Sequence, residues 1–202
     1  MKRFETELPE GYREVYCIDA KDKKTGLILN GAALVLFLIA LAPFALTFDY
    51  SRLPELVHPR SNLLLMYAIF FGGMLLYIVL HELVHGAAYK ILTKQKLTFG
   101  ITWSAAFCGV PQIYCYRTVM LISILAPFVV FSAVLLPLAL AFANNTPVYL
   151  GLVLLFCAHI SGCVGDLFGT MIMLFRYRNS DMLANDTGPK QTFFLPAEKT
   201  KL

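Results

Sequence analysis

The sequence predicts an all-α integral membrane protein with about four transmembrane helices and a small β-hairpin-like segment on the cytoplasmic side. Three observations lead to this fold class. Hydrophobic residues make up 58% of the 202 residues and charged residues only 15%, whereas soluble domains carry about 25% charged residues. The charged residues are concentrated in four polar segments. Between them lie apolar runs of the roughly 20 residues that are needed to cross the hydrocarbon of a bilayer.

Four apolar runs are expected to cross the membrane as helices. No charged residue interrupts the first or the third, and the second is uncharged as far as Leu80. The fourth carries two ionisable residues, His159 and Asp166. A polar N-terminal segment precedes the first run and no signal-peptide cleavage site is visible, so the first run is expected to act as the insertion signal. The expected spans are residues 26–48, 63–92, 119–143 and 148–175.

Lys and Arg residues are unevenly distributed among the polar segments. The N-terminal segment holds six, the segment after the second span holds four and the C-terminal tail holds five, whereas the two remaining loops hold only two between them. Cytoplasmic loops of membrane proteins carry such an excess of positive charge. We therefore expect both termini and residues 90–117 to lie in the cytoplasm. The net charge of +4 predicts membrane lipid as a partner and, without a stripe of interleaved basic and aromatic residues, no nucleic acid.

Residues 94–116 differ from the other polar segments because they are rich in residues that favour strands. Gly109-Val110-Pro111 is typical of a turn. The pattern predicts a small β-hairpin against the cytoplasmic face, and an amphipathic loop anchored at the membrane interface by Trp103 is the alternative. The strand-favouring residues are Thr98, Ile101, Thr102, Trp103, Ile113 and Tyr114.

The second expected span ends in His81-Glu82-Leu83-Val84-His85. In a helix, His81 and His85 project from the same face, one turn apart, so their imidazoles can occupy two corners of a tetrahedral Zn²⁺ site. Glu82 lies beside the first ligand, where it can accept a proton from the metal-bound water as the general base of a zinc peptidase. Ionisable residues within a span are functional candidates. The alternative is a helix end at which polar side chains simply meet water.

A catalytic zinc ion takes three protein ligands and keeps one position open. Asp166 is the expected third ligand, because it is the only acidic residue in the first, third and fourth spans. His81 precedes Lys90 by nine residues and Asp166 precedes Arg176 by ten, so both are expected about 13–15 Å inside the cytoplasmic surface. His159, seven residues before Asp166, is an alternative ligand, a hydrogen-bonding support for the site, or a polar group on a water path.

Two further features concern packing. The five cysteines include no Cys-x-x-Cys pair and are interpreted as small apolar residues or free thiols, not as a disulfide framework or a thiolate zinc site. Ser161, Gly165 and Gly169 are spaced four residues apart and predict a ridge of small residues at which helices approach closely. Such an approach would bring the short side chain of Asp166 towards the second span.

Residues 63–178 resemble the membrane-embedded zinc peptidases of the site-2 protease type. The chain looks most similar to a compact bacterial family of membrane zincins of uncharacterised function. The shared pattern is a His-Glu-x-x-His motif on one span, a strand-rich cytoplasmic segment, and an Asp ligand on a later span. The residues that carry the resemblance are His81-Glu82-Leu83-Val84-His85-Gly86 and Gly165-Asp166-Leu167-Phe168-Gly169.

The resemblance implies a protein of the bacterial cell membrane that hydrolyses a membrane-associated or transmembrane peptide. Zn²⁺ would be held by His81, His85 and Asp166, and Glu82 would be the catalytic residue. A helical substrate would have to unwind, and an edge of the hairpin could hold it by strand addition. The expected organisation is a cytoplasmic N-terminal segment at residues 1–25, a four-span membrane domain with the zincin-like site at 26–178, and a cytoplasmic tail at 179–202; no oligomeric state is predicted.

Other functions fit parts of the same pattern. A non-catalytic membrane scaffold with a structural metal site would not need the carboxylate of Glu82. A small metal- or proton-handling membrane protein would need polar residues through the depth of several helices, and the first and third spans have almost none. A peptidase domain outside the membrane would need longer polar segments than this chain has.

Overall fold

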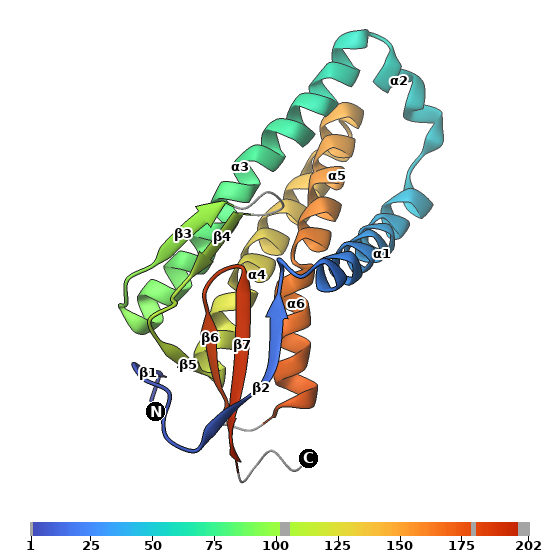
Figure 1. Cartoon of the computed structure of the whole chain (residues 1–202). Coiled ribbons are helices and arrows are strands. Elements are labelled where there is room, and N and C mark those ends of the chain that lie inside the picture. The colour runs from blue at the N-terminus through green and yellow to red at the C-terminus, as the bar shows by residue number, and fades with distance from the viewer. Residues whose placement is uncertain (1, 102–105, 179–180, 198–202) are drawn as a thin grey trace. The chain divides into compact units, whose positions relative to one another are not determined.

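A computed structural model of the chain describes residues 2–101, 106–178 and 181–197 (Figure 1). It is mostly helical, as predicted, with a small antiparallel sheet that was not predicted. The helices are α1 (Lys23–Thr47), η1 (Tyr50–Arg52), α2 (Leu53–Val57), α3 (Arg60–Thr93), α4 (Arg117–Ala141), α5 (Thr146–Gly162), α6 (Val164–Met171) and the π-helical turn η2 (Ile172–Arg176). The strands are β1 (Phe4–Glu5), β2 (Tyr12–Asp19), β3 (Thr98–Ile101), β4 (Ala106–Gly109), β5 (Tyr114–Tyr116), β6 (Leu183–Asp186) and β7 (Lys190–Pro196).

Three of the described helices, α1, α3 and α4, are long and apolar enough to cross a membrane, and α5 with α6 and η2 makes a fourth if this bent pair is one span. The helices begin and end close to the boundaries of the expected spans. The fourth span differs from the prediction because its helix is interrupted at Cys163, between the end of α5 and the start of α6. The segment from His159 to Asp166 therefore does not form two turns of one continuous helix.

The chain forms two compact units. The first, here called the sheet unit, comprises Met1–Leu29, His81–Pro127 and Gly165–Leu202, and the second, here called the helical unit, comprises Asn30–Leu80 and Phe128–Val164. Helices α3 and α4 contribute residues to both units.

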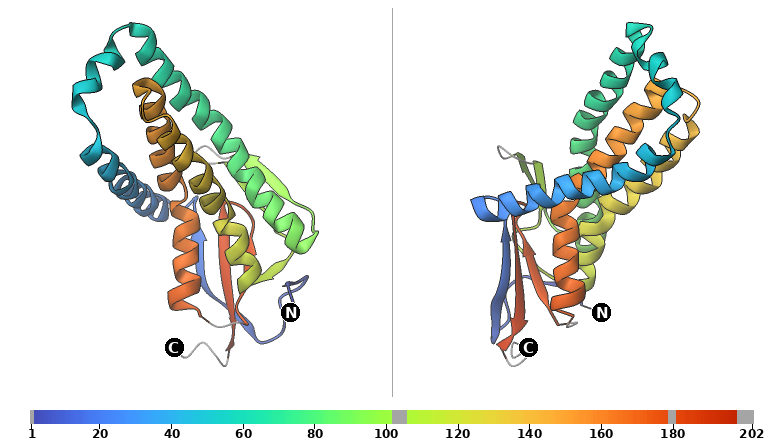
Figure 2. Two further views of the ribbon diagram at one scale, coloured as in Figure 1. Left: turned by 180° about the vertical axis from the view of Figure 1, so that it is seen from behind. Right: turned by 90° about the vertical axis from the view of Figure 1, so that its right-hand side faces the viewer.

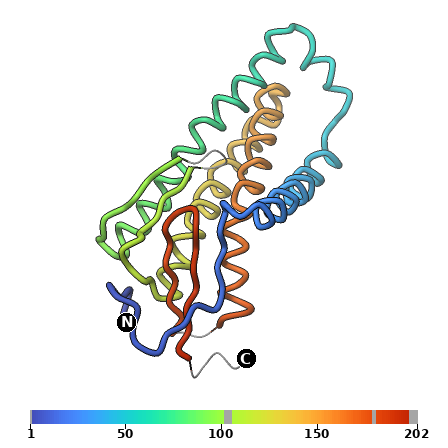
Figure 3. Tube along the Cα trace, in the orientation of Figure 1, coloured from blue at the N-terminus to red at the C-terminus, as the bar shows by residue number. Residues whose placement is uncertain are grey.

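A five-stranded antiparallel sheet in the order β1-β5-β6-β7-β2 organises the sheet unit. Strands from opposite ends of the chain lie side by side, since β2 pairs with β7 from Tyr12↔Pro196 to Asp19↔Lys190 (Figure 3). Helix α6 and the first turns of α4 cover one face of the sheet (Figure 2). Apolar side chains from both layers fill the space between them, among them Ile18, Cys115, Met120, Ile124, Met173, Ala184, Phe193 and Leu195.

The predicted β-hairpin is present, but the turn predicted at Gly109-Val110-Pro111 connects β4 to β5, where the N–H of Ile113 donates to the carbonyl of Val110 at 3.2 Å. β3 pairs with β4 from Thr98↔Gly109 to Ile101↔Ala106, so the connection runs through residues 102–105. These residues, with the expected strand positions Thr102 and Trp103, lie outside the described part of the chain. Gly109 ends β4 instead of turning the hairpin, because the following residue, Val110, donates its N–H to the carbonyl of Asp186 at 2.8 Å. This bond carries the chain on to β5.

The helical unit is built from long helices that pack through apolar side chains. Tyr149, Leu152 and Val153 of α5 are buried, and aromatic side chains of α1 such as Phe37 and Phe44 pack on them. A second cluster joins Tyr77 of α3, Leu135 of α4 and Leu155 of α5. Packing is tight at Gly73, where an added Cβ would lie 2.7 Å from the side chain of Leu155.

Candidate metal centre

One face of α3 carries the two histidines of the His-Glu-x-x-His motif into the sheet unit. His81 and His85 are 8% and 7% exposed, whereas Leu83, between them, is 49% exposed. The helix continues through the motif without a proline or other break, so the four-residue spacing keeps both imidazoles on the buried face. Burial of two polar rings without partners would be unfavourable, and both have partners in this unit.

The carboxylate of Asp166 meets both imidazoles. Asp166 lies in the first turn of α6, and its Oδ2 atom is 3.4 Å from Nε2 of His81 and 3.5 Å from Nε2 of His85. The two Nε2 atoms are 3.1 Å apart. Nitrogen and oxygen ligands at 2.0–2.1 Å from a tetrahedral zinc ion are separated by about 3.3 Å. The three atoms therefore fit three corners of a zinc tetrahedron and leave the fourth for water or substrate.

His85 is oriented by a backbone group of a neighbouring helix. Its Nδ1 atom lies 2.9 Å from the carbonyl oxygen of Ser123 on α4. Metal-binding histidines commonly donate their second ring N–H to such a group, which fixes the ring and its tautomer. The contact therefore belongs to the arrangement expected around a metal ligand.

Glu82 lies beside β4, close enough to His81, His85 and Asp166 for their charges to act on its carboxylate. Its carboxylate accepts a hydrogen bond from the backbone N–H of Cys108. The side chain is only partly buried, as a group that exchanges protons with water or substrate must be. Burial raises the pKa of Cys108 to about 12, so at neutral pH this neighbour remains a thiol.

Tyr89 and Asp186 extend the polar network, and both were missed by the sequence reasoning. Tyr89 lies one helical turn after His85, and its phenol donates to Oδ2 of Asp186 at 2.6 Å. Oδ1 of Asp186 accepts the N–H of Gly188 at 2.8 Å. Burial raises the pKa of Asp186 to about 6, although the hydrogen bonds from Tyr89 and Gly188 act to lower this pKa. The four-residue spacing could have identified Tyr89, but no sequence signal pairs it with Asp186.

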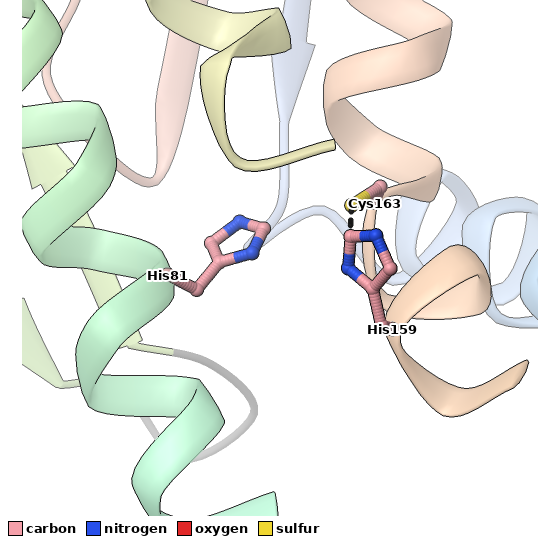
Figure 4. Close-up of side chains that lie close together, drawn as sticks. All are labelled: His81, His159 and Cys163. Atoms are coloured by element: carbon pink, nitrogen blue, oxygen red, sulfur yellow. Dashed lines mark hydrogen bonds between the residues drawn. The ribbon is translucent and has the colours of Figure 1, made fainter. Parts of the chain in front are cut away.

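His159, the predicted alternative ligand, belongs to the helical unit, whereas His81, His85 and Asp166 belong to the sheet unit. In the helical unit, His159 lies beside Cys163 (Figure 4) and contacts Tyr77 and Ser132.

The small residues Ser161, Gly165 and Gly169 do not form the single ridge that was predicted. Nothing lies within 4 Å of a Cβ added at Gly165, while one added at Gly169 would meet Gln191 of β7 at 2.7 Å. The break at Cys163 separates Ser161 from both glycines, so the three do not form one ridge.

Residues 74–182, more than half of the chain, match the sequence profile of a family described as putative zincin peptidase. The match includes both histidines, Glu82 and Asp166. No curated protein and no solved structure matches the chain.

Proposed function

Since this chain belongs to the putative zincin peptidase family, we propose that it is a membrane-embedded zinc metallopeptidase that hydrolyses peptide bonds in or near the membrane. The observation that carries the proposal is the triangle formed by His81 Nε2, His85 Nε2 and Asp166 Oδ2, with sides of 3.1, 3.4 and 3.5 Å. Two neutral nitrogen donors and one carboxylate, with a fourth position open, are the ligand set of catalytic rather than structural zinc.

The three ligands would hold Zn²⁺, which supplies a Lewis acid that polarises a peptide carbonyl and acidifies a water molecule. Glu82 is the general base in this proposal. Its carboxylate takes a proton from the attacking water and returns it to the leaving amine nitrogen, the exchange expected of a zinc-peptidase glutamate. The N–H of Cys108 holds that carboxylate towards β4. One side chain thus serves both proton transfers while the three ligands stay in place.

The hairpin next to Glu82 supplies a surface for an extended substrate. Within the described residues β3 pairs only with β4, so its other edge can accept an unwound peptide by strand addition. Adjacent residues of a strand direct their N–H groups to opposite edges. The variants Thr98→Pro and Phe99→Pro, made separately, therefore remove one N–H that faces β4 and one that faces the free edge of β3. Cleavage unchanged in both variants would contradict this binding mode.

Membrane insertion is the second part of the proposal, and it is supported by the three or four helices that are long and apolar enough to cross a bilayer. In this arrangement the substrate is a transmembrane or membrane-associated peptide, as the resemblance to site-2 proteases implies. Carbonate extraction of membranes that contain the tagged chain tests insertion. Release into the soluble fraction would contradict it.

Metal content and one carboxylate variant test the enzymatic part. The detergent-purified protein is expected to hold a zinc ion at this centre, and His81→Ala and Asp166→Asn are each expected to lose that ion. Mapping of new peptide N-termini in membranes should reveal cleavage products with the wild type that are absent with Glu82→Gln. A Glu82→Gln protein that keeps its zinc and yields the same N-termini would instead favour a non-catalytic scaffold with a structural metal.

A further inference from the structure

A second cluster of metal-ligating side chains lies within the helical unit. His159 of α5 and Cys163 at the end of that helix are both fully buried, with 0% exposure, and Tyr77 of α3 is 6% exposed. Cys163 follows His159 by four residues, and Figure 4 shows its sulfur beside the imidazole ring. We propose that Tyr77, His159 and Cys163 form a second metal site, for a thiophilic d¹⁰ cation such as Zn²⁺.

The distances between the donor atoms fit a bound cation. His159 Nδ1 is 3.6 Å from Cys163 Sγ, and nitrogen and sulfur ligands of tetrahedral zinc are separated by about 3.6 Å when the Zn–N and Zn–S distances are near 2.05 and 2.3 Å. The Tyr77 hydroxyl is 3.0 Å from Nδ1 and 3.9 Å from Sγ, each about 0.3–0.4 Å from its tetrahedral value. Both sulfur contacts lie within the hydrogen-bonding range of sulfur, and the same distances suit ligands that share an ion.

The other ring nitrogen of His159, Nε2, has a hydrogen-bonding partner of the kind found behind histidine ligands of metals. Nε2 of His159 is 3.1 Å from Oγ of Ser132 on α4. When Ser132 accepts the Nε2 proton, Nδ1 keeps an unprotonated lone pair that faces Tyr77 and Cys163. Support of this kind, by a hydroxyl or carbonyl on the far ring nitrogen, orients histidine ligands in zinc proteins.

The three polar side chains of the cluster are buried among aromatic rings, which is unusual for a simple packing contact. Aromatic rings surround the imidazole of His159. The centroid of this imidazole lies 5.4–6.3 Å from the ring centroids of Tyr77, Phe128, Phe131 and Phe156. The rings of Tyr77 and Phe131 are 5.1 Å apart. Polar groups buried among apolar side chains are unfavourable unless they are paired, and ionisable residues inside candidate spans mark functional positions. A cation would be bound by all three side chains, which already contact one another in this cluster.

Binding converts the thiol into a ligand. The Cys163 S–H bond breaks as the metal–sulfur bond forms, and the proton leaves to water, as metal binding by cysteine requires. Tyr77 keeps its proton and binds through the oxygen of its neutral hydroxyl. A thiolate and an imidazole together select Zn²⁺ or Cu⁺ over Mg²⁺ and Ca²⁺, which prefer oxygen. The interpretation of all five cysteines as packing residues or free thiols thus changes for Cys163, because the His159-x-x-x-Cys163 spacing places both donors on one helical face.

Metal stoichiometry tests the site independently of the proposed peptidase function. The full-length protein in detergent is stripped with a chelator, reloaded with Zn²⁺, and analysed for zinc per chain. We expect about two zinc ions in the wild type, one in Cys163→Ala, one in Asp166→Asn and none in the double variant. Cys157→Ala removes another buried cysteine of the same unit and should retain both ions.

The possible failures are distinguishable. One zinc ion in the wild type that disappears with Asp166→Asn and remains with Cys163→Ala would overturn the second site and leave the peptidase site intact. One ion with the reverse dependence would support the second site and contradict the first. Loading with Cd²⁺ adds a direct readout, since the ultraviolet charge-transfer band of a cadmium–thiolate bond should appear in the wild type and in Cys157→Ala. Its persistence in Cys163→Ala would also overturn the assignment.

Discussion

The Nδ1 atom of His85 lies 2.9 Å from the backbone carbonyl oxygen of Ser123. Because a carbonyl oxygen can only accept, Nδ1 carries the proton in this contact. In the neutral ring, Nε2 is then unprotonated and directs its lone pair towards Nε2 of His81 and Oδ2 of Asp166. A backbone group of α4 therefore selects the tautomer that can bind a metal.

Loss of either imidazole should abolish tight zinc binding at this centre. His85→Ala removes one of three ligands and leaves the Ser123 carbonyl without its donor, so zinc affinity should fall by more than about 100-fold, the upper range for loss of a mere supporting contact. Competition with a zinc-binding dye measures the change. His58→Ala is the control, because His58 belongs to the helical unit and is not part of the ligand triangle. Equal affinity in wild type and His85→Ala would refute the ligand assignment.

Glu82→Gln should separate metal binding from catalysis. The amide is similar in size to the carboxylate but cannot take the proton from water, so peptide cleavage should fall by about 10²- to 10⁴-fold, the usual contribution of general acid–base catalysis. Zinc content should stay at the wild-type level, because Glu82 lies outside the triangle of ligand atoms. Quantification of the new N-termini in membranes, beside zinc analysis of the same preparation, measures both. Loss of zinc would make Glu82 a ligand and contradict the proposed role.

The helices and the pairing of His81 with His85 could be predicted because both depend on local sequence. Apolar runs of membrane-crossing length set the boundaries of α1, α3 and α4, and a four-residue spacing places His81 and His85 on one helical face. A comparison of depth, counted from Lys90 and Arg176, was enough to suggest Asp166 as their neighbour. Such reasoning works where position along one helix determines position in space.

The sheet could not be predicted in the same way because its pairing is not local. β2 and β7 lie at opposite ends of the chain, and each is short and bordered by charged residues that favoured the interpretation as polar segments. The break at Cys163 has no proline to mark it. The N–H of Cys108 that meets Glu82 belongs to the backbone, and backbone donors have no signature in the residue type.

Asp186 should make stability depend on pH in a defined window. Burial raises its pKa from the ordinary value of 3.8 to about 6, so between these values the folded state binds the proton that the unfolded state has released. Stability therefore falls as the pH rises from about 4 to about 6, and the loss is complete above that range. Each tenfold change in proton affinity corresponds to about 1.4 kcal/mol, so the loss is about 3 kcal/mol.

Thermal unfolding of the wild type and of Asp186→Asn across this range isolates the effect. The asparagine can still accept from Tyr89 but does not titrate, so the difference in unfolding temperature between the two proteins should change with pH between 4 and 6 and stay constant from pH 7 to 8. Other acidic groups titrate in both proteins and cancel in the comparison. Parallel curves for the two proteins would show that Asp186 does not titrate with a raised pKa.

Gly109 should be intolerant of any side chain, because β4 passes the turn between β6 and β7 at the closest possible distance. A Cβ at this position would lie 2.5 Å from the backbone nitrogen of Gly188 and 2.8 Å from the carbonyl oxygen of Asp186. Backbone atoms cannot rotate away as a side chain can, so Gly109→Ala should lower the free energy of unfolding by about 1–3 kcal/mol. Because Cys108 next to it holds Glu82, cleavage should fall while zinc binding persists.

Gly72→Ala is the matched control for this substitution. Gly72 lies in α3, and nothing is within 4 Å of a Cβ added there, so alanine should leave stability unchanged or raise it by up to about 1 kcal/mol through its better helix propensity. Unfolding temperature, zinc content and the yield of new N-termini are measured on both variants. A Gly109→Ala protein that matches Gly72→Ala in all three would show that β4 is free to move from the β6–β7 turn, and the hairpin could not then be what fixes Glu82.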